Sequence, residues 1–154
     1  MEIQRQDNAS VRIHPPVLML LHLGASILLG WFLPISLPGW AVYAGWVVVA
    51  AGIVFASGGL RRLISAHTSP DPHTPTTTVV TTGIYRFTRN PIYMGFLCVV
   101  IGFPLAFGSP WGIFIGAIQI LLFNRLIIER EETYLTQKFG QEYLDYKARV
   151  RRWL

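Results

Sequence analysis

The chain has 154 residues, of which 52% are hydrophobic and only 14% charged, and its formal net charge is +5. It is far more apolar than an average soluble domain, and two stretches, 13–60 and 90–124, contain no Asp, Glu, Lys or Arg. A soluble protein of this length could not bury such stretches, so the sequence excludes a soluble class and predicts a membrane-embedded chain.

Each uncharged stretch is too long for a single membrane span, which takes about 20 apolar residues. Proline and glycine interrupt the first stretch at 34–39 and the second at 107–110. The sequence therefore predicts an all-α, polytopic membrane protein with four transmembrane helices, at 17–33, 40–60, 92–107 and 111–128. We expect the spans to form two hairpins within a single domain that covers residues 1–154.

The basic residues are unevenly distributed along the chain. Arg61, Arg62, Arg86 and Arg89 lie between the hairpins, a further group of arginines and lysines follows residue 124, and the two hairpin tips carry no charge. Lys and Arg accumulate in the cytoplasmic segments of membrane proteins. We therefore expect both termini and the central segment to be cytoplasmic, and we attribute the basic charge to topology and not to nucleic-acid binding.

The central segment 65–83 is rich in proline and threonine and lacks helical periodicity, so it is predicted to be a loop. We expect residues 69–78 to be mobile without a ligand and to become ordered when a cofactor binds. His67 and His73 could share a metal ion, but only Asp71 is an obvious third ligand nearby. We interpret both histidines as solvated and expect no metal site.

The tail shows the clearest helical periodicity. Its aromatic and apolar residues recur at steps of four, three, four and three: Phe139, Tyr143, Tyr146, Val150 and Trp153. This spacing predicts a C-terminal amphipathic helix. The helix can lie at the cytoplasmic interface, or it can cover a cofactor pocket, and the two interpretations are compatible.

A polar motif at 83–95 precedes the third predicted span. Pro91 suits the first turn of a helix, and Asn90 is then placed to cap it. The amino end of a helix attracts anions, and Arg89 beside it can bind a carboxylate. A capped helix start with interface anchors such as Tyr85 and Arg86 would explain the same residues without a function.

A carboxylate cluster follows the fourth predicted span. Glu129 and Glu132 share one helical face, and Glu131 points about 100° away from Glu132. Acidic groups at a membrane interface are costly and often functional. The alternative is a solvated helix extension in which Arg125 and Arg130 balance the acids.

Taken together, the motifs resemble a known family. They occur in the order Gly83-x-Tyr85-(x)3-Arg89-Asn90-Pro91-x-Tyr93-x-Gly95, an apolar hairpin, Glu131-Glu132, and then the aromatic tail. Residues 66–154 thereby resemble the membrane methyltransferases related to isoprenylcysteine carboxyl methyltransferase and the phospholipid N-methyltransferases. The family usually has histidine where this chain has Asn90, so any proton-transfer role of that histidine does not carry over.

The resemblance implies an S-adenosylmethionine site at the cytoplasmic face, built from segments 83–95 and 129–154. It implies catalytic roles for Arg89, Asn90 and Glu132. The residues it implies in cofactor binding are Tyr85, Arg89, Asn90, Pro91, Tyr93, Glu131, Glu132, Tyr134 and Leu135.

The activity implied is methyl transfer to an apolar or lipid-attached thiol, carboxylate or amine that enters from the bilayer. Two alternatives stay open. A sterol-reductase-type enzyme shares the C-terminal resemblance but is usually a longer chain. A non-catalytic membrane interaction protein on the same scaffold is favoured by the loss of histidine at position 90.

Overall fold

The computed structural model describes residues 7–154 and contains only helices and connecting segments over that range. In chain order the elements are α1 (Pro15–Phe32), α2 (Gly39–Ser65), the 3-10 helix η1 (Gly83–Arg86), α3 (Pro91–Ala106), α4 (Trp111–Phe123), the π-helix η2 (Asn124–Ile128), α5 (Glu129–Phe139) and α6 (Gln141–Arg149). The predicted all-α class is confirmed, and the central segment is a loop apart from η1.

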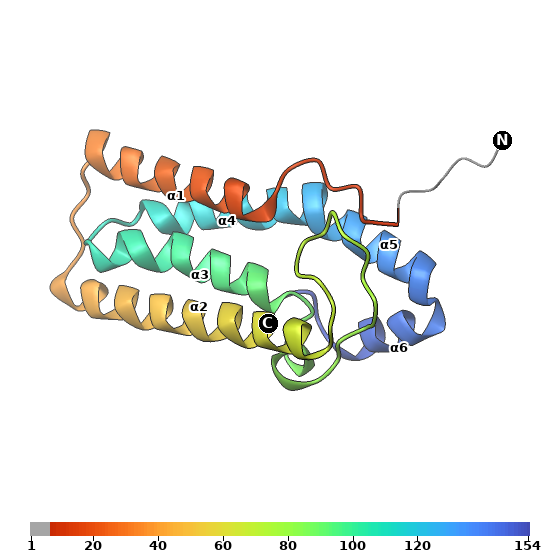
Figure 1. The fold of residues 1–154 in the computed structure, drawn as a ribbon. Coiled ribbons are helices and arrows are strands. Elements are labelled where there is room, and N and C mark those ends of the chain that lie inside the picture. Colours follow the sequence, from red (N-terminus) through yellow and green to blue (C-terminus); the bar gives the residue numbers. More distant parts are fainter. Residues whose placement is uncertain (1–6) are drawn as a thin grey trace.

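Helices α1 to α4 lie side by side as a bundle, and α5, α6 and the central loop gather at one end of it (Figure 1). Three helical stretches are long and apolar enough to cross a membrane: α1, α2 and the continuous run Trp111–Phe139. The apolar part of that run ends at Ile128, because charged residues begin at Glu129. Helix α3 has 16 residues, about 24 Å at the helical rise, and is shorter than each of those three stretches.

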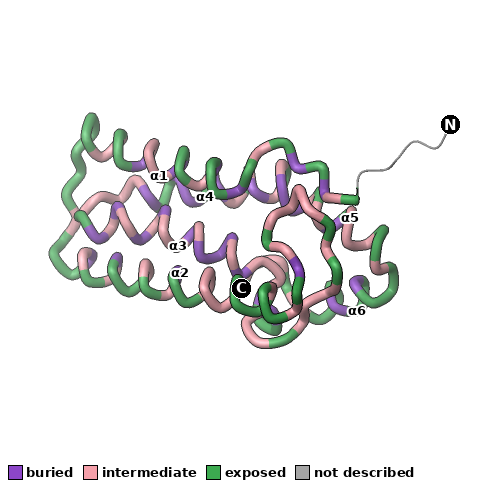
Figure 2. Tube along the Cα trace, in the orientation of Figure 1, coloured by how far each residue is buried: buried purple, intermediate pink, exposed green. Residues whose placement is uncertain are grey.

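Small residues allow α3 to pack closely against α2. A Cβ added to Gly52 would lie 2.9 Å from the carbonyl oxygen of Gly95, and one added to Gly95 would lie 2.7 Å from that of Gly52. Both distances are too short for side chains larger than glycine, as in other closely packed membrane helices. Helix α3 is the most buried helix of the bundle, whereas α1 and α2 expose much of their outer faces (Figure 2). Trp31 is 81% exposed, as expected of a lipid-facing side chain.

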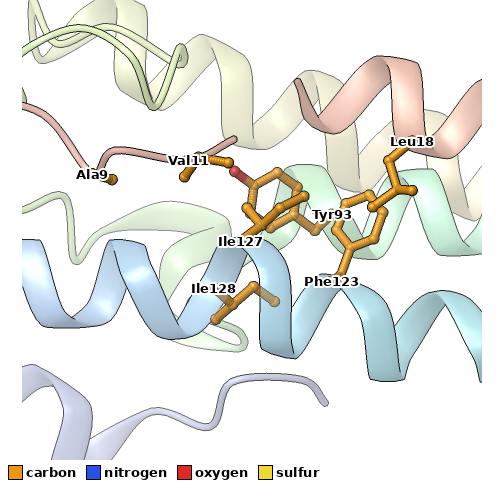
Figure 3. Packing of buried hydrophobic residues seen from close by; sticks show 7 residues of the cluster. All are labelled: Ala9, Val11, Leu18, Tyr93, Phe123, Ile127 and Ile128. Carbon is orange, nitrogen blue, oxygen red and sulfur yellow. The ribbon is translucent and has the colours of Figure 1, made fainter. Parts of the chain in front are cut away.

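An apolar cluster packs the helices together at the end of the bundle that carries the polar motifs. Its buried members come from the N-terminal segment, α1, α3, α4 and η2: Ala9, Val11, Leu18, Tyr93, Phe123, Ile127 and Ile128 (Figure 3). The π-helix η2 contributes Ile127 and Ile128, which are fully buried. Such segments are rare and frequently occur at functional sites. The cluster holds Tyr93 against the helix that leads to the carboxylates.

The tail differs from the single amphipathic helix that its periodicity predicts. Gly140 has φ +54° and separates α5 from α6, which ends at Arg149. Four of the five expected residues share a cluster with Tyr85: Phe139, Tyr143, Tyr146 and Val150. Trp153 packs in the apolar cluster of α3 and α4 instead. The prediction of one continuous helix through the tail is wrong, because Gly140 readily adopts a positive φ and ends α5.

Candidate functional site

The turn before α3 is built together with the C-terminal tail. The backbone N–H of Arg89 donates to the carbonyl of Arg151 at 2.9 Å, and the buried Thr88 hydroxyl donates to the carbonyl of Arg152 at 2.9 Å. Asn90 occupies the N-cap position of α3, but its side chain makes no cap hydrogen bond. Its amide donates to the carbonyl of Arg152 at 3.1 Å. The expected side-chain cap is therefore wrong: the side-chain oxygen of Asn90 accepts from no N–H of the first turn, and the amide group instead donates to the tail.

Glu132 is the centre of an ion-pair network. Its side chain is only 7% exposed, and Nη2 of Arg89 lies 3.0 Å from Oε1. Nε and Nη2 of Arg152 donate to the two carboxylate oxygens at 2.9 Å each, and Nζ of Lys147 lies 3.1 Å from Oε2. Burial alone would raise the pKa of Glu132, but the hydrogen bond from Arg152 and the charge of Arg89 bring it below its ordinary value. The ionised carboxylate therefore joins the start of α3, α6 and the tail.

Arg89 retains hydrogen-bond donors that none of the residues described by the structure uses. Its side chain is 9% exposed, and Nη2 is occupied by Glu132. Nε and Nη1 are buried and have no partner among residues 7–154. A buried donor left unsatisfied costs about 1–3 kcal/mol, more for a charged group. Arg89 is thus prepared to donate to an anionic ligand.

Glu131 is held differently from its neighbour. The Tyr93 hydroxyl donates to Oε1 of Glu131 at 2.5 Å. Burial raises the pKa of Glu131 to about 7; the hydrogen bond from Tyr93 opposes the rise, and the charge of Glu132 adds to it. Glu129, by contrast, pairs with Arg125 at 3.8 Å on a more exposed face. The solvated-extension interpretation therefore describes Glu129 but not Glu131 or Glu132.

These side chains line a cavity of about 140 Å³. All nine residues expected to bind a cofactor contribute to its wall: Tyr85, Arg89, Asn90, Pro91, Tyr93, Glu131, Glu132, Tyr134 and Leu135. They come from η1, the turn before α3, the first turn of α3, and α5. The structure brings together residues that are up to 50 positions apart, since Tyr85 and Leu135 share the wall.

The remaining wall was not predicted residue by residue, although we expected the loop 69–78 to become ordered around a cofactor and the tail helix to be able to cover a pocket. It consists of further residues from the N-terminal segment, α2, the central loop, α3 and α6: Ala9, Leu63, Ser69, Pro70, Asp71, Pro72, Thr76, Thr78, Val79, Val80, Ile92, Tyr143 and Tyr146. The aromatic periodicity of the tail was a usable signal for Tyr143 and Tyr146. The loop was expected to respond to a cofactor, but no pattern showed which of its residues reach the cavity, because tertiary contacts alone place them there.

The central loop crosses the cavity and is fastened on both sides. The Ala9 N–H donates to the carbonyl of Pro72 at 3.1 Å, and the Thr76 N–H donates to the Tyr134 hydroxyl at 3.1 Å. That hydroxyl donates in turn to Oδ1 of Asp7 at 2.9 Å. The loop and the N-terminal segment together form the outer wall of the cavity, at the end of the bundle where α5 begins (Figure 1).

A second, mainly apolar cavity of about 690 Å³ lies next to the first, between α1, α2 and α3. Its wall includes Met19, Ile53 and Phe96. The two cavities share five wall residues: Pro70, Asp71, Pro72, Ile92 and Tyr93. A polar and an apolar binding space therefore meet at the start of α3.

Comparison with known proteins places most of the chain in one group. Residues 40–142 match the family model described as phospholipid methyltransferase. The chain is 40% identical over 75 residues to the protein-S-isoprenylcysteine O-methyltransferase of Mus musculus, a match covering 49% of this chain and 26% of the relative. The protein of the same name from Saccharomyces cerevisiae is 36% identical over 72 residues, which are 47% of this chain and 30% of the relative.

An uncharacterized protein from Haemophilus influenzae is 43% identical over 63 residues, 41% of this chain and the full length of that relative. The match to the two named methyltransferases thus spans less than a third of their own length. No solved structure shows a significant match.

Proposed function

The chain belongs to the phospholipid methyltransferase family, and from this premise we propose that it transfers a methyl group from S-adenosylmethionine to an apolar or lipid-attached acceptor. It is an integral membrane protein, and we place the reaction at the cytoplasmic face. The observation that carries the proposal is the cavity where Arg89 presents two buried donors, without a partner among residues 7–154, beside the Glu131–Tyr93 pair.

The residues present fit the cofactor. Nε and Nη1 of Arg89 would donate to its methionine carboxylate, next to the amino end of α3 with its positive dipole. Glu131 would accept from the cofactor's amino group. Glu132 is less suited to that role, because its oxygens already accept from Arg152 and pair with Arg89.

Two of the three residues implied as catalytic therefore receive positioning roles. Glu132 holds Arg89 by their 3.0 Å ion pair, and Asn90 holds the tail through the carbonyl of Arg152. Tyr85, Tyr134 and Leu135 would form the wall for the adenosyl group.

We assign the acceptor's apolar part to the 690 Å³ cavity between α1, α2 and α3. An acceptor that enters from the bilayer would place its reactive atom near Ile92 and Tyr93, which both cavities share. The acceptor atom is a thiol, a carboxylate or an amine.

The cofactor supplies a methyl group on a positively charged sulfur, and this charge disperses as the methyl leaves. The chain's own contribution is alignment and exclusion of water. Arg89 and Glu131 would fix one end of the cofactor, and the loop that Tyr134 fastens through Thr76 would close the cavity to solvent.

We also propose four membrane spans with both termini cytoplasmic. Helix α3 packs beside α2 and α4 in the same bundle (Figure 1), and its ends lie near theirs. The basic residues at 61–62, 86–89 and beyond 124 all lie at or near the end that carries the site, and the opposite tips are uncharged. That distribution supports a cytoplasmic site.

The test is methyl transfer by the protein purified in mild detergent. Labelled S-adenosylmethionine is incubated with thiols, isoprenylcysteine analogues and lipid amines, and the label in each acceptor is counted. We expect transfer to at least one apolar acceptor and none to its water-soluble counterpart. Protein that binds no S-adenosylmethionine while remaining folded contradicts the proposal and favours the non-catalytic scaffold.

A further inference from the structure

Two histidines and an aspartate from separate segments meet beside the two cavities. His14 precedes α1, and Asp71 and His73 belong to the central loop. One ligand atom of each residue lies within 4.8 Å of the others, and the two imidazole rings have centroids 4.1 Å apart. The sequence suggested His67 as the companion of His73, but in the structure His14 takes that place.

The contacts of His73 leave its Nδ1 facing the carboxylate of Asp71. Nε2 lies 2.8 Å from the carbonyl oxygen of Val11, which can only accept, so the hydrogen is assigned to Nε2. Nδ1 lies 2.9 Å from Oδ1 of Asp71, and an ionised carboxylate can also only accept. A neutral His73 would point its lone pair at this oxygen. A metal ion bound by both Nδ1 of His73 and the Asp71 carboxylate would use this lone pair.

The surroundings of His73 suit a metal ion. The nearby ring of His14 brings a second imidazole nitrogen within reach of the same point, so that one ion can use the lone pairs of both rings. The Nε2–H of His73 bonded to the Val11 carbonyl is the outer-sphere contact that metal-ligating histidines usually make. Two imidazole nitrogens and one carboxylate oxygen, completed by water, form a common zinc ligand set.

We propose that His14, Asp71 and His73 bind a zinc ion that clips the central loop to the N-terminal segment. Pro70, Asp71 and Pro72 line both cavities, so the ion would hold the loop in place across them. The neighbouring hydrogen bond from Ala9 to Pro72 joins the same two segments. The ion would join two segments of the chain, and its existence does not depend on the proposed methyl transfer.

The experiment measures Zn²⁺ binding to the full chain in detergent micelles, after any purification tag has been removed. Competition with a chelating dye gives the affinity and the stoichiometry. The variants are His73→Ala and Asp71→Asn, and the matched control is His67→Ala, which removes a histidine from the same loop outside the cluster. We expect one zinc ion per chain for wild type and His67→Ala, and at least tenfold weaker binding for the other two variants.

Co²⁺ substitution provides a second readout, since its visible absorption reports the ligand set directly. Wild type and His67→Ala should show the bands of a tetrahedral site with nitrogen and oxygen ligands, and His14→Ala should lose them without loss of helical circular dichroism. Zinc should also slow proteolysis of the loop in wild type but not in Asp71→Asn. Equal zinc affinity of wild type, Asp71→Asn and His73→Ala, or no binding by wild type, would overturn the proposal.

Discussion

Replacement of Arg89 by alanine tests the assigned anchor of the cofactor. The guanidinium has two buried donors, Nε and Nη1, that nothing within residues 7–154 uses. A hydrogen bond to a charged partner contributes about 1.5–3 kcal/mol, so loss of the contact should weaken S-adenosylmethionine binding by roughly ten- to a hundredfold. The protein should still fold, because Arg152 and Lys147 continue to neutralise Glu132.

The assay is isothermal titration calorimetry on detergent-purified protein whose folding has been verified by circular dichroism. Arg86→Ala is the matched control, since Arg86 is an exposed arginine three positions earlier, and it should bind as wild type does. Arg89→Lys keeps the charge but has a different donor geometry, so its affinity should fall between those of wild type and Arg89→Ala. Equal affinities for Arg86→Ala and Arg89→Ala would refute the assignment of Arg89.

Four further outcomes are expected. Glu132→Gln should destabilise the protein by about 3 kcal/mol in denaturant unfolding, because it leaves Arg89 and Arg152 without their buried partner; a change below about 0.5 kcal/mol would place Glu132 at the solvated surface. Burial raises the pKa of Glu131 to about 7, and the ammonium group of bound S-adenosylmethionine would lower it, so cofactor binding should release a proton and the cofactor affinity should increase as pH rises towards 7. Glu131→Gln should abolish this pH dependence of affinity; a pH dependence that persists in the variant argues against the contact. Proteolysis within residues 69–78 should slow when S-adenosylmethionine is added; equal cleavage rates would mean that the loop does not respond to the cofactor. In a Cys98→Ser background, cysteines at Ser36 and Phe107, both exposed at the hairpin tips, should react with an impermeant reagent from outside; reaction from the cytoplasm alone would reverse the topology.

Helix positions were predictable because charge and apolar runs determine them almost locally. The predicted spans 17–33 and 92–107 differ from α1 and α3 by only one or two residues at each end. That the residues of the candidate site lie together was also predictable, since the two ends of a hairpin must return to the same end of the bundle. Tyr93 and Glu131, which belong to different motifs, consequently meet in one hydrogen bond.

What the sequence did not predict depends on contacts between distant segments. Asn90 occupies an N-cap position, yet it bonds to the carbonyl of Arg152, which no local pattern indicates. The same holds for His14, whose closeness to His73 follows from how the N-terminal segment crosses the loop. Gly140 is an exception, because a glycine within a helical pattern is a local signal for a helix end. The regular spacing of the aromatic residues on both sides of it favoured one continuous helix instead.

The most direct test of the central claim is photo-crosslinking of labelled S-adenosylmethionine to the detergent-purified protein, followed by mapping of the labelled peptides. The account predicts label in the peptides that carry Tyr85–Tyr93 or Glu131–Leu135, displaced by an excess of the unlabelled cofactor. Label confined to other parts of the chain, or label that the excess does not displace, would contradict it.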